Sequence, residues 1–214
     1  MSDNLVYVPL QLFALLYAIV IHEWAHGYAA LKMGDKTAYY MGRLTLNPLK
    51  HIDPIGTVLL PAIMLIFRSP IMFGWAKPVP INPGNFNDIR KGQIVVALAG
   101  PGANLISAFF FTGCLIIMGL AVPQTMFMYE GLKAFFNFAM MINIVLFAFN
   151  LIPIPPLDGS HILAMLLPPK QAFEYNKIAP FGFVIIMGLL LMGLIDRYLI
   201  FVWNLYMYLL NLIF

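Results

Sequence analysis

Long apolar runs separated by short polar segments make up most of this sequence. They span residues 8–33, 55–75, 93–122, 132–153, 178–195 and 198–214. Most of these runs approach or exceed the roughly 20 residues that an α-helix needs to cross the hydrocarbon core of a bilayer. The pattern therefore predicts an all-α polytopic membrane protein with about five transmembrane helices.

The run 55–75 differs from the others because two prolines and an arginine interrupt it. We expect it to enter the membrane and return on the same side, as a re-entrant segment. With that course, Lys133 and Arg197 are the only outward-lying members of the 12 lysines and arginines. Cytoplasmic loops carry the excess of Lys and Arg, so this arrangement places the end of the first helix at the cytoplasmic face.

A polar segment, 35–53, follows the first apolar run. Two short stretches in it, 36–40 and 43–46, are β-prone and flank Gly42. Such stretches on either side of a glycine are typical of a hairpin. The sequence therefore predicts a small β-hairpin on the cytoplasmic side.

The composition narrows the protein class further. Of the 214 residues, 62% are hydrophobic and only 10% are charged. This is too little charge to cover a water-soluble domain, because charged side chains are rarely buried. The net charge of +3 is spread over loops and fits anionic lipid better than nucleic acid. Cys114 is the only cysteine, which excludes an intrachain disulfide and a thiolate metal cluster.

The sharpest chemical signal is the sequence His22-Glu23-Trp24-Ala25-His26 inside the first apolar run. Residues four apart share one face of a helix, so both imidazoles can reach a single zinc ion. Glu23 stands beside the first histidine and is placed to act as a general base toward water. Ionisable side chains are costly inside a membrane and usually functional. The alternative is a pair of histidines that hydrogen-bond to neighbouring helices, with Glu23 in a proton relay.

Catalytic zinc sites usually have three protein ligands, so a third is needed. Asp158 stands out because prolines before it and Gly159 after it unwind the chain and aim a carboxylate into the bundle. The alternative role for Asp158 is the N-cap of a short helix over 159–167. If 93–122 runs outward and 132–153 runs back inward, Asp158 reaches the cytoplasmic end where the histidines lie.

Three separated motifs carry a resemblance to a known family. They are His22-Glu23-Trp24-Ala25-His26, Ala99-Gly100-Pro101-Gly102-Ala103-Asn104, and Asn150 followed by Pro153 and Pro156-Leu157-Asp158-Gly159. Together they resemble the site-2 protease family of intramembrane zinc metalloproteases, in its compact branch without a PDZ domain. The resemblance covers about residues 19–163.

The resemblance implies a role for each matching residue. His22, His26 and Asp158 would be the ligands of Zn²⁺, and Glu23 the catalytic base. Asn150 matches an asparagine that holds the substrate or its oxyanion. We interpret the glycine-rich motif as packing against the helix of the histidines, with Asn104 hydrogen-bonding across helices. His161 is interpreted as a packing residue or a hydrogen-bonding partner behind the ligands.

These observations predict one membrane-embedded metalloprotease domain over 1–214, with a catalytic core at about 8–167 and C-terminal helices at 178–214. The expected function is hydrolysis of peptide bonds within or next to transmembrane segments, in a multi-pass cell-membrane protein with its active site near the cytoplasmic face. By family analogy, the substrates are single-pass regulators or signal-peptide remnants.

Two alternatives come from other functional classes. A zinc or ion transporter predicts polar residues lining a path to the outer face, and the sequence has almost none. A catalytically silent membrane scaffold predicts the loss of Glu23 or of a ligand, and every expected residue is present.

Overall fold

The computed structural model describes residues 7–59, 63–64, 66, 74 and 76–213. The regular elements among these residues are all helical. The long helices are α1 (Val8–Lys32), α4 (Ile89–Ala121), α5 (Tyr129–Asn150), α8 (Gly182–Leu191) and α9 (Leu194–Ile213). The short ones are α2 (Thr37–Tyr40), η2 (Pro48–Lys50), η3 (Pro54–Leu59), η4 (Pro83–Asn85), α6 (Asp158–Leu166), α7 (Pro169–Asn176) and η5 (Ala179–Phe181).

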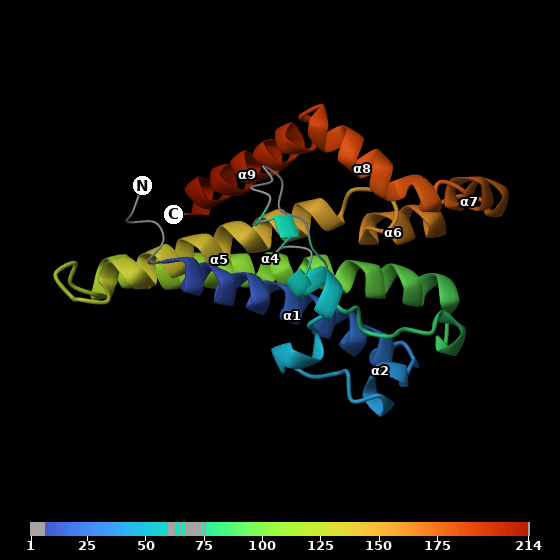
Figure 1. Cartoon of the computed structure of the whole chain (residues 1–214), viewed down its shortest axis with the longest axis horizontal. Coiled ribbons are helices and arrows are strands. Elements are labelled where there is room, and N and C mark those ends of the chain that lie inside the picture. The colour runs from blue at the N-terminus through green and yellow to red at the C-terminus, as the bar shows by residue number, and fades with distance from the viewer. Residues whose placement is uncertain (1–6, 60–62, 65, 67–73, 75, 214) are drawn as a thin grey trace.

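Four helical stretches are long and apolar enough to cross a membrane. They are α1, α4, α5 and the stretch Pro169–Leu191. A multi-pass membrane protein is therefore confirmed, whereas the exact number of spans stays a prediction. The chain bends near Gly193, whose φ of 67° suits glycine. From this bend, α9 runs back along α5 toward the end of the bundle where α1 begins (Figure 1).

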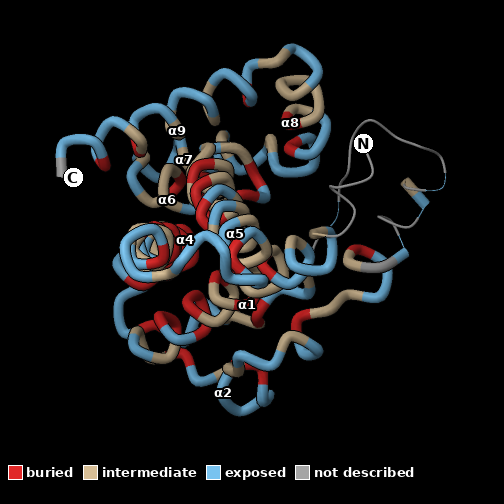
Figure 2. Tube along the Cα trace, turned by 90° about the vertical axis from the view of Figure 1, so that its left-hand side faces the viewer, coloured by how far each residue is buried: buried red, intermediate tan, exposed pale blue. Residues whose placement is uncertain are grey.

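Helices α1, α4 and α5 lie side by side and form the core of the molecule (Figure 1). Alanines stand at their contacts: Ala14 of α1, Ala108 of α4 and Ala139 of α5 are all 0% exposed. Small residues let helix backbones approach closely, which is how helices associate in lipid, where burial against lipid tails gives no driving force. Figure 2 shows that the buried positions of these three helices face one another, while their outer faces are exposed.

The segment between α1 and α4 leaves and rejoins the bundle at the same end. Gly34 follows the end of α1 and has a φ of 112°, and a Cβ there would lie 2.9 Å from the Asn85 carbonyl oxygen. Beside it, the Asn87 N–H donates to the Met33 carbonyl at 2.9 Å. A re-entrant course requires such a return. The predicted re-entrant stretch 55–75 itself falls largely outside the described residues and stays a prediction.

The predicted β-hairpin around Gly42 is wrong: residues 36–46 are all described and form no strand, and the first of the two predicted stretches is helical. Residues Thr37–Tyr40 form α2, and Asp35 accepts hydrogen bonds from the N–H and hydroxyl of Thr37 at its start. At its end, Arg43 N–H donates to the Ala38 carbonyl and Gly42 N–H to the Tyr39 carbonyl. This is a Schellman motif, so Gly42 ends a helix instead of turning a hairpin.

Candidate metal centre

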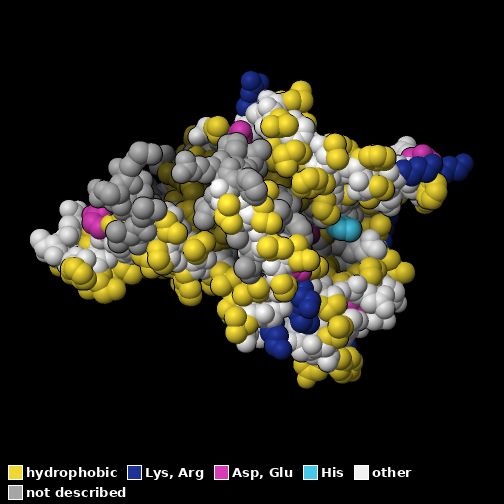
Figure 3. Space-filling model, viewed as in Figure 1, with side chains coloured by type: hydrophobic (Ala, Val, Ile, Leu, Met, Phe, Trp, Pro, Cys, Tyr) yellow, Lys and Arg dark blue, Asp and Glu magenta, His cyan; other side chains and the backbone are white. Residues whose placement is uncertain are grey.

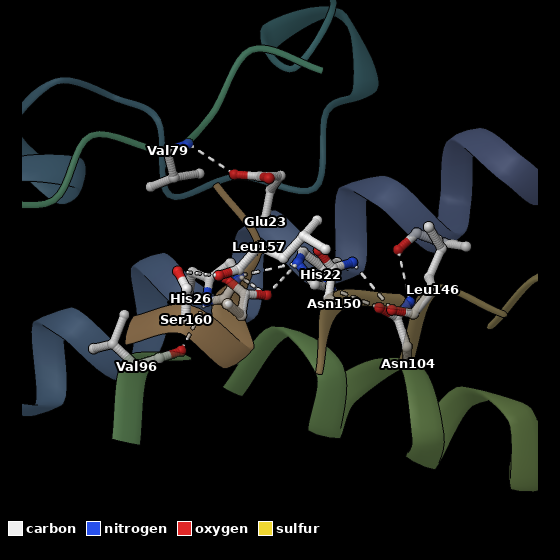
Figure 4. Close-up of polar contacts among 12 residues, drawn as sticks. His22, Glu23, His26, Val79, Val96, Asn104, Leu146, Asn150, Leu157 and Ser160 are labelled. Carbon is white, nitrogen blue, oxygen red and sulfur yellow. Dashed lines mark hydrogen bonds and ion pairs between the residues drawn. The ribbon is translucent and has the colours of Figure 1, made fainter. Parts of the chain in front are cut away.

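Helix α1 presents His22 and His26 on its buried face, against α4 (Figure 4). His22 Nδ1 lies 2.6 Å from Asn104 Oδ1, and His26 Nδ1 lies 2.7 Å from the Val96 carbonyl oxygen. Both partners are acceptors, so in each ring Nδ1 carries the proton and Nε2 bears a free lone pair. Helix α4 thus fixes both imidazoles in the tautomer that binds a metal through Nε2.

The side-chain amide of Asn104 has its orientation fixed by a second asparagine. Its Nδ2 donates to the Ala18 carbonyl at 3.0 Å and to Asn143 Oδ1 at 2.9 Å. Asn143 in turn donates to the Ala139 carbonyl at 2.8 Å. Because Nδ2 is committed to two acceptors, Oδ1 is the atom that faces His22. The expected interhelical hydrogen bonding of Asn104 is confirmed.

Asp158 is the first residue of α6, and its carboxylate lies beside the two histidines of α1. The N-cap of α6 is Leu157, and no side chain caps this helix. The alternative role of Asp158 as an N-cap is therefore wrong, and its carboxylate is free for another partner. Asp158 Oδ2 lies 3.2 Å from His22 Nε2 and 3.3 Å from His26 Nε2.

These three atoms fit a zinc ion. The two Nε2 atoms are 3.0 Å apart, and Asp158 Oδ2 is buried without a hydrogen-bond partner although both imidazoles are within ion-pair distance. With both Nε2 atoms unprotonated, three lone-pair donors converge, and a cation bound by all three would relieve their repulsion. Zinc bonds of about 2.0–2.1 Å in tetrahedral geometry place neighbouring ligand atoms roughly 3.3 Å apart. The observed separations match that value.

Gly100 gives the histidines their space. A Cβ at this position would collide with His26 Nε2 and with His22 Cε1, the latter at 2.7 Å. Any larger residue would displace the two rings. The interpretation of the glycine-rich motif as a packing surface for the histidine helix is therefore confirmed, with a specific reason for Gly100.

A cavity of about 730 Å³ lies beside the three atoms. Glu23, Asn150 and His161 all line it. Glu23 Oε2 accepts a hydrogen bond from the Val79 N–H at 2.8 Å (Figure 4). Asn150 Nδ2 donates to the Leu146 carbonyl of its own helix at 3.0 Å. His161 is exposed and is not part of the cluster of His22, His26 and Asp158.

Sequence reasoning missed three contributors to this site. The Val96 carbonyl and the Val79 N–H are backbone groups, and residue type gives no signal for them. Asn143 did carry a signal, as a polar residue within an apolar run, and it is 0% exposed. Its importance depends on contact with Asn104, which lies 39 positions earlier in the chain.

Asn104→Ala is expected to weaken zinc binding by about 10–100-fold, the usual cost of losing a group that orients a ligand. The substitution leaves the protonated Nδ1 of His22 without its acceptor. Zinc affinity can be measured by competition with a chelator. Asn137→Ala is the matched control, since Asn137 is exposed and donates only to the Lys133 carbonyl of its own helix. Equal zinc affinity in the two variants would contradict the orienting role.

Comparisons with known proteins agree with these observations. Residues 115–192 match the model of Peptidase family M50. "Putative zinc metalloprotease YwhC" of Bacillus subtilis is 39% identical over 193 residues, covering 87% of this chain and 84% of the relative. "Putative zinc metalloprotease Rip2" of Mycolicibacterium smegmatis is 30% identical over 183 residues, covering 86% and 67%. No solved structure matches the chain. The chain belongs to Peptidase family M50, which confirms the resemblance to the site-2 proteases.

Proposed function

We propose that His22, His26 and Asp158 hold the zinc ion of this intramembrane metalloprotease and that Glu23 is its general base. The observation that carries the proposal is the convergence of the two Nε2 atoms and Asp158 Oδ2 within 3.0–3.3 Å of one another. The reaction is hydrolysis of peptide bonds within or next to transmembrane segments of substrate proteins.

A zinc ion at this position supplies a Lewis acid that polarises a carbonyl and makes water nucleophilic near neutral pH. Glu23 lines the same cavity and takes the proton from the attacking water. It then returns this proton to the leaving amine. Asn150 lines the cavity too, and its amide has a second N–H to offer the oxyanion, since Leu146 takes only one.

The cavity suits an unwound peptide segment. Apolar side chains of Val79, Ile81, Phe86 and Val96 line it together with the three ligands, Glu23 and Asn150. A substrate helix hides its carbonyls in backbone hydrogen bonds, so the helix must unwind locally before Glu23 can act on it. We expect single-pass membrane proteins, such as regulators or signal-peptide remnants, as substrates.

We place the active site near the cytoplasmic face. The ends of α1 and α5 and the start of α4 lie at one end of the bundle, beside α6 and α7 (Figure 1). In Figure 3, Lys and Arg side chains lie at the tip of α7, below the bundle in the segment that follows α1, and near the bend between α8 and α9. Basic residues are enriched on the cytoplasmic side of membrane proteins, which supports this orientation.

A zinc chelator is expected to abolish cleavage of a single-pass model substrate reconstituted with the protein in vesicles. Added zinc should restore the activity, because the metal ligands remain folded in the bundle. The fraction of substrate cleaved, followed by gel or mass spectrometry, measures both steps. Cleavage that persists in protein shown by metal analysis to be free of zinc would refute the proposed function.

A further inference from the structure

A segment without regular secondary structure, residues 76–82, contacts α1 and lines part of the cavity. Its centre is Val79, whose N–H holds Glu23 Oε2 at 2.8 Å. The Val79 side chain is 5% exposed and packs on Gly27, one helical turn beyond Glu23. A Cβ at Gly27 would lie 2.9 Å from Val79 Cγ1. The segment is thus seated directly on the helix that carries Glu23.

The Val79 N–H is the group that restrains the end of the Glu23 side chain. Glu23 is not part of a salt bridge among the described residues. Its three side-chain torsions leave a carboxylate at many positions relative to a substrate unless a fixed donor selects one. A site displaced by about 1 Å can lose 10²-fold in rate. The position of Glu23 therefore depends on the position of residues 76–82.

Arg43 anchors this segment beside Val79. Its Nη2 donates to the carbonyls of Lys77 and Pro78 at 3.0 and 3.1 Å, just before Val79 in the chain. The Lys77 N–H also donates to the His51 carbonyl at 2.9 Å. Further along, the Asn82 N–H donates to Asp35 Oδ2 at 2.7 Å. Arg43 is the only side chain that donates to the segment among the described residues.

Arg43 is a costly residue in this place. It is only 9% exposed, its Nε is buried without a hydrogen-bond partner, and its described partners are carbonyls, with no carboxylate to neutralise it. Burial of a charge without a counter-charge is unfavourable. Arg43 is placed by the Schellman motif that ends α2, through its N–H bond to the Ala38 carbonyl. Because Arg43 holds the carbonyls of Lys77 and Pro78, it also fixes the position of the next N–H in the chain, that of Val79.

We propose that Arg43 is a positioning residue for the general base: it fixes the carbonyls of Lys77 and Pro78 so that the Val79 N–H holds Glu23 in its working position. This inference rests on the proposed function, in which Glu23 is the base. Arg43 itself does not line the cavity. It acts through the backbone of residues 76–82, so its larger effect is expected on the rate of the chemical step and a smaller one on substrate binding, while the zinc ligands keep their positions.

Four variants test the proposal by steady-state cleavage of a model transmembrane substrate. Arg43→Gln is expected to lower kcat by about 10–100-fold with KM within about twofold. Arg43→Lys should recover part of the loss, because an ammonium can donate to a carbonyl. Val79→Pro removes the N–H and should lower kcat as much as Arg43→Gln, whereas Val79→Ala keeps the N–H and should lose less. Arg197→Gln, at an exposed arginine, is the matched control.

The double variant Arg43→Gln/Val79→Pro separates positioning from general destabilisation. If Arg43 acts through Val79, the double variant loses no more kcat than Val79→Pro alone. Hydrogen exchange of the peptide 77–82, followed by mass spectrometry in the zinc-loaded protein, gives a readout apart from activity. The prolines leave few amides in this peptide, and Arg43→Gln should speed their exchange while zinc content stays at the wild-type value.

Several results would overturn the inference: unchanged or increased kcat in Arg43→Gln or Val79→Pro, additive losses in the double variant, or zinc lost together with activity. Glu23→Gln, measured in the same assay, keeps this test apart from that of the proposed function. An active Glu23→Gln protein refutes Glu23 as the base. An inactive Glu23→Gln protein alongside a fully active Arg43→Gln protein refutes only the positioning role.

Discussion

Glu23→Gln protein is expected to bind zinc at the wild-type stoichiometry and to cleave a transmembrane substrate about 10²–10⁴-fold more slowly, the usual contribution of general acid–base catalysis. An amide cannot take a proton from water, which removes the base. The shape of the side chain is kept, and the amide oxygen can still accept the Val79 N–H that Glu23 Oε2 accepts at 2.8 Å. Loss of activity therefore reports on proton transfer, and not on a displaced segment or a missing metal.

Glu174→Gln is the matched control for this experiment. Glu174 lies on α7, where it is exposed and forms a surface ion pair with Lys177 at 2.7 Å. Such pairs contribute little, so this variant should keep wild-type activity. Cleavage by single-turnover kinetics and zinc by elemental analysis should be measured on the same preparations. A Glu23→Gln protein with more than a tenth of the wild-type rate would remove Glu23 from the mechanism.

Local patterns in the sequence predicted the parts of the fold that depend on local geometry. The helix that carries His22 and His26 was expected over 8–33 and is Val8–Lys32. Its end at Gly34 follows from the need for a positive φ, which is 112° there. The i, i+4 spacing placed both imidazoles on one face, because helical periodicity needs no tertiary information.

The β-hairpin prediction failed because β propensity is a weak preference, and local hydrogen bonds outweigh it here. Thr37 is a β-prone residue by type, yet Asp35 accepts a hydrogen bond from the Thr37 N–H at 3.0 Å and starts a helical turn. Gly42 fits a hairpin and a helix C-terminus equally well from sequence alone. β-propensity scales describe residues on a half-buried pleated surface. Tyr39 and Tyr40 are 60% and 75% exposed, so they lack the packing on which a high β propensity depends.

The contacts between distant residues were the part of the site that sequence could not supply. Val79 reaches Glu23 across 56 positions, and Asn104 reaches His22 across 82. The flanking prolines and glycine identify Asp158 as a candidate ligand. Tertiary packing, which the sequence does not show, decides whether its carboxylate caps a helix or faces the histidines. The structure places Leu157 at the cap position and so leaves the Asp158 carboxylate free.

Asp158→Ala protein is expected to lose zinc and with it all cleavage. Asp158 is the only charged member of the cluster, and its Oδ2 is buried without a hydrogen-bond partner of its own. Removal leaves two neutral imidazoles, which hold zinc more weakly than the three protein ligands usual for catalytic sites. The loss should exceed the 10–100-fold cost of removing a group that only orients a ligand.

The fold should survive this substitution. Helix α6 has no side-chain cap to lose, and α4 packs on α6 independently of the carboxylate. Asp196→Ala is the matched control, because Asp196 is exposed in the first turn of α9. Size-exclusion profiles in detergent that match the wild type would show that both variants are folded.

Joint binding of one zinc ion by α1 and α6 is tested most directly by the zinc content of folded, dialysed Asp158→Ala protein. The arrangement of His22, His26 and Asp158 predicts about one zinc ion per chain in the wild type and in Asp196→Ala, and almost none in Asp158→Ala. A folded Asp158→Ala protein that kept its full zinc content would contradict it.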